Sequence, residues 1–552
     1  MKSFLSRSAI SKVYAAILAI IIIVAVILGS LYAAGYFKTS TSTTTTARIL
    51  RFTHPAPWHI DPAVGSDLAS ASSLINLYDP LVFPETVAEG SGVKPWIATN
   101  WTSSTDGLTW TFTIRQGVLF HSGNELNATD VAFSMNRLLT IGQGYSYLFT
   151  PYVSSANATG PWTVVITLSK PFAPFLLSLV RLWILDSRTV IAHETAGAYG
   201  ANGDYGMAWL DIYDAGSGPF TVKSNSVALL TMTFFSNYWG TVAPLHPTEV
   251  DLIAEPTSTT EISMMDTGSL EITSPWLSDL QYESLNGTNG IYIANVPEPN
   301  EYYYMMNTLK PPLDDIHVRE ALAYCLNYTG LIAELYPLST VSTSCVPASV
   351  AGYLDCSPYY YNVTKAEQEL AMSKYASNIS SYSIDFDWIS AVPIRELDAS
   401  YFANCAQAIG IKVNVIAEPW TKFESDVASA ATCPGMANVE VDSDYTEAGS
   451  LLEARYSSAS MGTWENMEWL NDSTYDSMLE TALGTLNQTQ RYTLYGTLQQ
   501  YIMNLCPSMY IFDYTMICAA QKYVNWPMAN VSQSVPSMGY NFDCRLIQIE
   551  PH

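Results

Sequence analysis

Basic residues are scarce in this chain. Of 552 residues, 24 are Lys or Arg and 50 are Asp or Glu, so the net charge is −26, and charged residues make up only 13%. A surface so poor in Lys and Arg repels phosphate backbones, which excludes nucleic acid as a partner. Hydrophobic residues reach 48%. At this length we expect two or three domains with large cores.

The common catalytic and metal-binding motifs are also missing. The chain has no Gly-x-Ser-x-Gly, no Cys-x-x-Cys and no zinc-type Cys/His cluster. His193-Glu194 opens no zinc motif, because Gly197 stands where the second His is needed. The Gly-rich turn Gly216–Phe220 lacks the Gly-Lys-Ser/Thr ending of a phosphate-binding loop. We therefore expect no enzyme, no cofactor and no metal site, and keep a surface hydrolase or a passive envelope protein only as alternatives.

Cysteine is absent from the first 324 residues, and all eight cysteines lie between Cys325 and Cys544. An even number in an extracellular protein suggests disulfides. Cys345 with Cys356 would form a local bridge, and Cys405 with Cys433 is a second candidate pair. Asn-x-Ser/Thr sequons also predict a glycoprotein, although some arise by chance in a Ser/Thr-rich chain. They lie at Asn100, Asn127, Asn157, Asn286, Asn327, Asn362, Asn378, Asn471, Asn487 and Asn530.

Residues 1–37 are predicted to be a membrane anchor or a signal. Lys2, Arg7 and Lys12 precede an apolar run, Val13–Leu31, which is long enough to cross a hydrocarbon core of about 30 Å. Basic residues on that side place the N-terminus inside the cell and the body outside. A cleaved secretory signal and a pilin-like cleavage near Ser11 are the alternatives. Residues 38–47 form a Ser/Thr-rich stalk that cannot build a core.

The most distinctive stretch is 106–138. Asp106-Gly107 is a turn dipeptide, and Thr109–Ile114 alternates like a strand. Asn127 or Thr129 can cap a following helix, and Asp130 suits the positive end of its dipole. The residues themselves predict a hairpin, a turn and a capped helix.

In order and spacing, this stretch resembles the signature of the family 5 (peptide/nickel type) extracellular substrate-binding proteins of ABC transporters. The matching positions are Asp106–Thr109, Phe112, Arg115, Gly117-Val118, Phe120-His121, Gly123, Leu126, Asp130-Val131 and Phe133-Ser134. Ile60-Asp61-Pro62, Pro95–Trp101, Gly216–Phe220 and Tyr302–Asn327 resemble further patterns of the family. Arg319, within the last of these, is expected to be structural.

The resemblance implies an α/β fold of the two-lobed periplasmic-binding-protein type (class II, cluster C), with an additional subdomain in the first lobe. Lobe one would comprise residues 48–80, 215–296 and 512–552, the inserted subdomain residues 81–214, and lobe two residues 297–511. The βαβ order of residues 383–415 independently favours a parallel sheet. We expect a monomer that passes its ligand to permease subunits driven by two ATPase subunits.

The resemblance also suggests the ligand site. Residues 439–447 resemble a family element whose Asp-Tyr pair maps to Asp444 and Tyr445, and in peptide binders that Asp pairs with the peptide α-ammonium. A solvated loop carboxylate is the alternative for Asp444. Trp420 and Trp388 are further ligand-binding candidates. Oligopeptides are the expected ligands. Because Trp388, Trp420 and Trp464 would suit sugar stacking, cellobiose-like oligosaccharides are the second candidate.

Overall fold

The computed structural model describes residues 47–56, 58–90, 92–356 and 359–552. The predicted anchor and all but the last residue of the predicted stalk lie outside these ranges. None of the helices in the described ranges is long and apolar enough to span a membrane. Every helix and strand named below belongs to the compact unit Arg48–His552.

The first strand after the predicted stalk joins a sheet formed mainly by residues far along the chain. β1 (Ile49–His54) pairs in parallel with β10 (Glu249–Ala254). β9 (Leu229–Phe234) and β8 (Phe220–Asn225) continue this sheet with antiparallel pairing. Leu50 and Phe52 on β1 are buried, because alternate residues of a strand point to the same face. The predicted strand at Arg48–Thr53 is confirmed.

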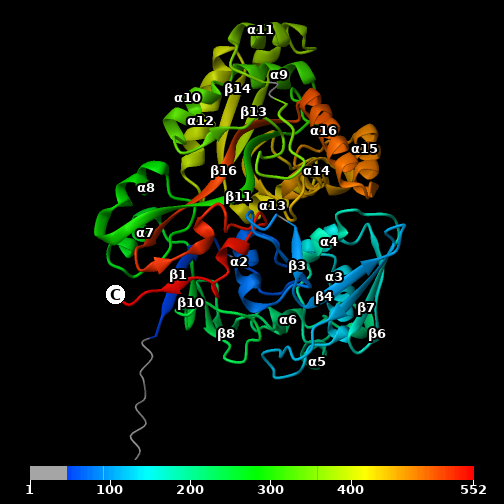
Figure 1. Cartoon of the computed structure of the whole chain (residues 1–552). Helices are drawn as coiled ribbons and strands as arrows, with labels where there is room; N and C mark the ends of the chain where they lie inside the picture. The colour runs from blue at the N-terminus through cyan, green and yellow to red at the C-terminus, as the bar shows by residue number, and fades with distance from the viewer. Residues whose placement is uncertain (1–46, 57, 91, 357–358) are drawn as a thin grey trace, which may run out of the picture. The chain divides into compact units, whose positions relative to one another are not determined.

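The second sheet has six strands in the order β12-β16-β11-β15-β13-β14. Its two long members, β11 (Ile291–Met306) and β16 (Ser508–Gln521), run antiparallel side by side (Figure 1). Ile272 forms bridges with both Phe52 of β1 and Ala520 of β16, so β16 reaches the first sheet. The other strands are β12 (Thr340–Val341), β15 (Met436–Asp442), β13 (Ser383–Ile389) and β14 (Lys412–Glu418).

The predicted βαβ unit is present in this sheet. β13 and β14 are parallel, and α12 (Ile394–Ala408) connects them. Gly410 follows the helix with φ 86°, a left-handed conformation that glycine adopts without strain.

Within the distinctive stretch 106–138 the predicted strand and the capped helix are present. The predicted hairpin with Val118–Phe120 is not, because Thr109–Ile114 pairs with residues 98–103 and 163–167 while Leu119 bridges Glu125. β5 (Thr109–Ile114) lies in a third sheet with β4 (Ala98–Ser103), β7 (Thr163–Leu168) and β6 (Val153–Gly160). α3 (Ala128–Ile141) begins with a capping box, in which Asn127 accepts from the helix backbone and Asp130 accepts from the Asn127 N–H.

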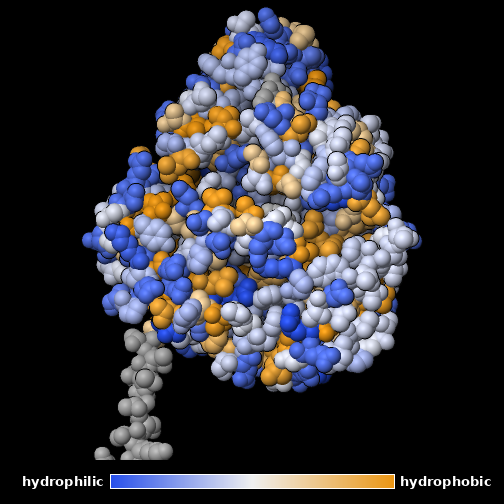
Figure 2. All heavy atoms as spheres, in the orientation of Figure 1, coloured by the Kyte–Doolittle hydropathy of each residue, from blue (hydrophilic) through white to orange (hydrophobic). Residues whose placement is uncertain are grey.

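The remaining elements connect and cover these sheets. They are α2 (Leu68–Leu77), β2 (Val82–Pro84), β3 (Val93–Pro95), α4 (Phe175–Ser178), α5 (Ser187–Ala192), α6 (Met207–Leu210), α7 (Ser258–Asp266), α8 (Asp279–Leu285), α9 (Ile316–Cys325), α10 (Tyr328–Leu335), α11 (Val363–Met372), α13 (Trp420–Val427), α14 (Ala448–Tyr456), α15 (Ser473–Gly484), α16 (Gln488–Leu505), β17 (Val524–Asn525) and β18 (Gln548–Ile549). On the face shown in Figure 2, apolar side chains lie in groups among polar ones.

Two sequence patterns have structural roles. Arg319 donates to the carbonyl oxygens of Cys506, Leu505 and Leu313 at 2.7–2.9 Å, so it caps the C-terminal end of α16, as the prediction of a structural role requires. A Cβ on Gly216 would lie 1.9 Å from the Leu77 carbonyl oxygen. This glycine is needed for close backbone packing against the end of α2.

The disulfide prediction is corrected by the structure, in which all eight cysteines are free. Cys405 lies near Cys325, and the thiol of its proposed partner Cys433 donates to a main-chain carbonyl at 3.4 Å. Cys345 is completely buried, and Cys356 is only partly exposed. Free thiols of this kind pack as small apolar side chains, so an even number of cysteines did not require pairing.

Candidate ligand-binding cavity

A cavity of about 150 Å³ opens between the four-stranded sheet that contains β1 and the six-stranded sheet. From the first side it is lined by His54 at the end of β1 and by Leu68 at the start of α2. From the other side it is lined by Asn300 of β11, Asp442 of β15 and Trp420 of α13. Trp276, Arg395, Glu440, Trp464 and Met538 also contribute to the wall.

Several lining side chains have buried polar atoms that find no hydrogen-bond partner among the described residues. They are both ring nitrogens of His54, Trp276 Nε1, Asn300 Oδ1, Arg395 Nε and Asp442 Oδ1. A buried polar group without a partner costs about 1–3 kcal/mol. Donors and acceptors of this kind gathered around one cavity indicate a site for a polar ligand.

The electrostatics of this cavity favour a cationic group. Burial, followed by the charges of Glu440 and Asp444, raises the pKa of Asp442 to about 7. Burial, followed by the charges of Asp444 and Asp442, raises the pKa of Glu465. The lining cation Arg395 already forms an ion pair with Glu440. A cation bound beside Asp442 would therefore relieve repulsion between carboxylates.

His54 is neutral in this setting. Its side chain is completely buried, and desolvation lowers its pKa to about 3. A neutral imidazole offers one donor and one acceptor. The ring contacts Phe52 and Phe542 at centroid distances of 5.7 and 4.9 Å, so its orientation is fixed by packing.

The structure places the predicted residue Asp444 just behind the cavity wall. Its side chain is 2% exposed and accepts a hydrogen bond from the Tyr147 hydroxyl. Its main-chain oxygen accepts from Arg181 Nε at 2.9 Å, and its N–H donates to Ser450 Oγ at 2.8 Å. Burial raises the pKa of Asp444, and Arg181 opposes that shift. The alternative of a solvated loop carboxylate is wrong, and it is the neighbouring Asp442 that lines the cavity.

The aromatic candidates separate into two groups. Trp420 lines the cavity, and its ring lies 5.3 Å from that of Trp464 at 67°. Trp388 on β13 is 8% exposed and is not part of the wall. Tyr445 is fully buried and packs edge-on against Phe172.

Sequence reasoning missed His54, Trp276, Asn300 and Arg395 as lining residues. His54 directly follows the predicted strand Arg48–Thr53, and a residue at a strand end is a reasonable site candidate. The elements that face it from the six-stranded sheet, however, are more than two hundred residues away in the sequence. Only the fold brings these side chains together.

Residues 92–463 match the family model described as bacterial extracellular solute-binding proteins, family 5, middle. The chain belongs to this family. It is 27% identical over 485 residues to heme-binding protein A of Haemophilus influenzae, covering 82% of this chain and 85% of that protein. It is 26% identical over 484 residues to the dipeptide-binding protein of Escherichia coli, covering 82% and 86%.

The family 5 fold is also shown by solved structures. The periplasmic binding protein DppA of Helicobacter pylori, in complex with the peptide STSA, aligns with a TM-score of 0.79 at 22% identity. The alignment covers 91% of this chain and 98% of that one. The predicted fold class is confirmed as a two-lobed periplasmic-binding-protein fold that mixes helices and strands.

Proposed function

We propose that this family 5 protein is the extracellular substrate-binding protein of an ABC importer and that it captures short peptides in the cavity lined by Asp442. The observation that carries the proposal is the group of buried, unpartnered polar atoms around that cavity. The dipeptide-binding relative and the peptide-bound structural neighbour support peptide as the ligand class.

The cavity offers a partner for each part of a short peptide. A desolvated α-ammonium needs a carboxylate, and Asp442, with Asp444 behind it, supplies one. The peptide backbone can donate to Asn300 Oδ1 and accept from Trp276 Nε1 and Arg395 Nε. The rings of Trp420 and Trp464 give an apolar wall for a ligand side chain.

The organisation expected from the sequence completes this proposal. Residues 1–37 would tether the protein, residues 38–47 would space it from the membrane, and the two lobes would close around the ligand as a monomer without catalysis. The permease with its two ATPase subunits would receive the peptide. Residues 48–80, 215–296 and 512–552 are proposed as lobe one, 81–214 as its inserted subdomain, and 297–511 as lobe two.

Calorimetry with dipeptides and tripeptides, each with a free or an acetylated N-terminus, tests this function. We expect free peptides to bind and acetylated ones to bind at least about tenfold more weakly, because acetylation removes the charge that the carboxylates neutralise. D442N and D444N should each reduce this preference. D385N is the matched control, because Asp385 is exposed and pairs with Asn414 at 2.9 Å.

A sugar ligand is the second candidate, and the adjacent Trp420 and Trp464 rings favour it. Cello-oligosaccharides are titrated in parallel. Tight sugar binding without any response to peptides would replace the peptide proposal.

A further inference from the structure

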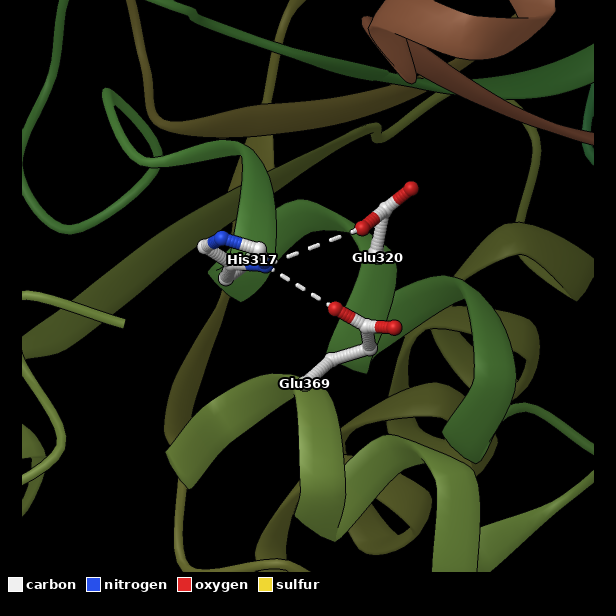
Figure 3. A group of neighbouring side chains, drawn as sticks. All are labelled: His317, Glu320 and Glu369. Atoms are coloured by element: carbon white, nitrogen blue, oxygen red, sulfur yellow. Dashed lines mark hydrogen bonds and ion pairs between the residues drawn. The ribbon is translucent and has the colours of Figure 1, made fainter. Parts of the chain in front are cut away.

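Three side chains that can ligate a metal meet between α9 and α11 (Figure 3), and none of them lines the ligand cavity. His317 and Glu320 lie three positions apart on α9, and Glu369 projects from α11. Residues three apart on a helix share one face, so α9 presents both side chains toward α11. His317 Nδ1 lies 2.9 Å from Glu369 Oε2 and 3.9 Å from Glu320 Oε2.

The two helices hold this arrangement in place. Asp315 caps the start of α9 and also accepts from Ser373 Oγ at 2.9 Å and from the Lys374 N–H at 2.8 Å, at the end of α11. The start of one helix is therefore tied to the end of the other, one turn from the three side chains. Preorganisation of this kind lowers the entropy cost of assembling ligands around an ion.

In the described part of the chain, no Lys or Arg forms an ion pair with Glu320 or Glu369, and both carboxylates face His317. Burial, followed by the neighbouring Glu369, raises the pKa of Glu320. Lys365 on α11 lowers it only in part, since its ammonium donates to the Tyr324 hydroxyl. The imidazole of His317 is the remaining facing group. Its Nδ1 faces an oxygen of each carboxylate.

We propose that His317, Glu320 and Glu369 bind a divalent transition-metal cation, with Zn²⁺ as the ion that best fits one nitrogen and two carboxylate oxygens. Zn²⁺ takes His nitrogen and carboxylate oxygen at about 2.0–2.2 Å. Ligand atoms at those distances in a tetrahedron lie roughly 3.4 Å apart. The three candidate ligand atoms all lie within 4.8 Å of one another, so small rotations of the glutamate side chains bring them to that spacing.

Three protein ligands leave one position of the ion for water or another ligand. The histidine side chain is 36% exposed and the Glu369 side chain 13% exposed, so an ion can enter from solvent while one carboxylate stays shielded. A bound ion would cross-link α9 and α11. It would act on lobe stability and would not take part in peptide binding.

The test uses the full-length protein after treatment with a chelator. It is titrated with Zn²⁺ by calorimetry and with Co²⁺ by visible absorption, which reports ligand geometry. We expect one ion per chain and a rise in unfolding temperature on addition of Zn²⁺. H317A, E320Q and E369Q should each weaken binding at least about tenfold and abolish the thermal shift.

E367Q is the matched control, because Glu367 is an exposed residue of α11, the helix that carries Glu369. It should bind Zn²⁺ as the original protein does. Unfolding without metal checks that each variant is folded, and the isosteric E320Q and E369Q serve if H317A is not. Absence of binding, or weak binding that these substitutions leave unchanged, would overturn the proposal. Peptide affinity is measured separately and has no bearing on this outcome.

Discussion

The hydroxyl of Tyr147 donates a hydrogen bond to the carboxylate of Asp444, a residue 297 positions later in the chain. Asp444 is the position that the family resemblance assigns to the peptide amine. A hydroxyl and an ammonium would therefore use the same carboxylate. The ligand-free arrangement keeps this buried charge hydrogen-bonded.

Y147F removes that donor without removing the ring. We expect a lower unfolding temperature for the ligand-free protein, because a buried carboxylate loses a partner that contributes about 1–3 kcal/mol. Saturation with peptide should reduce the difference, since an ammonium held at Asp442 also stabilises the charge of the neighbouring Asp444. Y213F, at an exposed tyrosine, is the control. Equal destabilisation with and without peptide would argue against a bound ammonium beside these two aspartates.

The affinity for peptide should depend on pH through Asp442, whose pKa is raised to about 7. The ionised carboxylate is the form that attracts an ammonium, and its fraction falls roughly tenfold for each pH unit below the pKa. The ionised fraction therefore rises roughly 25-fold between pH 5.5 and 7.5, and we expect the affinity for a dipeptide, measured by calorimetry, to rise by about that factor. D442N should flatten this profile and D385N should leave it intact. A flat profile in the original protein would contradict the assignment.

The raised pKa of Asp442 also makes stability depend on pH, but stability falls with rising pH whereas peptide affinity rises. An unfolded Asp titrates near about 3.9, whereas Asp442 titrates near 7 in the fold, and burial also raises Glu301 and Glu453 to pKa values of about 7. Between those limits the folded state holds more protons, so stability falls as pH rises. We expect the ligand-free protein to melt at a higher temperature at pH 6 than at pH 7.5. An unchanged or lower melting temperature at pH 6 would contradict this.

Asp61 and Arg137 form a bidentate pair at 2.6 Å, and both side chains are almost completely buried. D61N leaves the guanidinium buried without its charge partner, which we expect to destabilise the fold by about 3–5 kcal/mol. Chemical denaturation measures the loss. D106N, at an exposed turn, is the control and should change stability little. Similar curves for the two variants would show that this pair is dispensable.

G216A tests the close approach of the turn to α2. A Cβ there would lie 1.9 Å from a main-chain oxygen, which backbone movement alone can relieve. We expect poor soluble expression or a strongly lowered unfolding temperature. G160A, where a Cβ meets nothing within 4 Å, should behave like the original chain. Normal folding of G216A would show that the turn can shift.

The fold was largely readable from the sequence, and the cavity was not. Local rules were sufficient for the capped helix after Asn127 and for the βαβ unit whose helix is followed by Gly410, because their signals lie within a few residues. The role of Asn300 left no local signal, and that of His54 only its place at a strand end, because both depend on two sheets meeting. The motif match pointed to Asp444, two residues from the aspartate that lines the cavity. The cysteine count misled, because all eight cysteines are free and six of them are buried.

The pairing of β11 with β16 shifts register between Pro297 and Asn300. A register shift interrupts the ladder of hydrogen bonds and makes a pair of strands easier to bend. Asn300, at the edge of this interruption, lines the cavity. A ligand that bonds to Asn300 thus contacts one of the two register shifts in the pairing of β11 with β16. Ligand binding in the cavity and bending of β11 and β16 would then meet at the same residue.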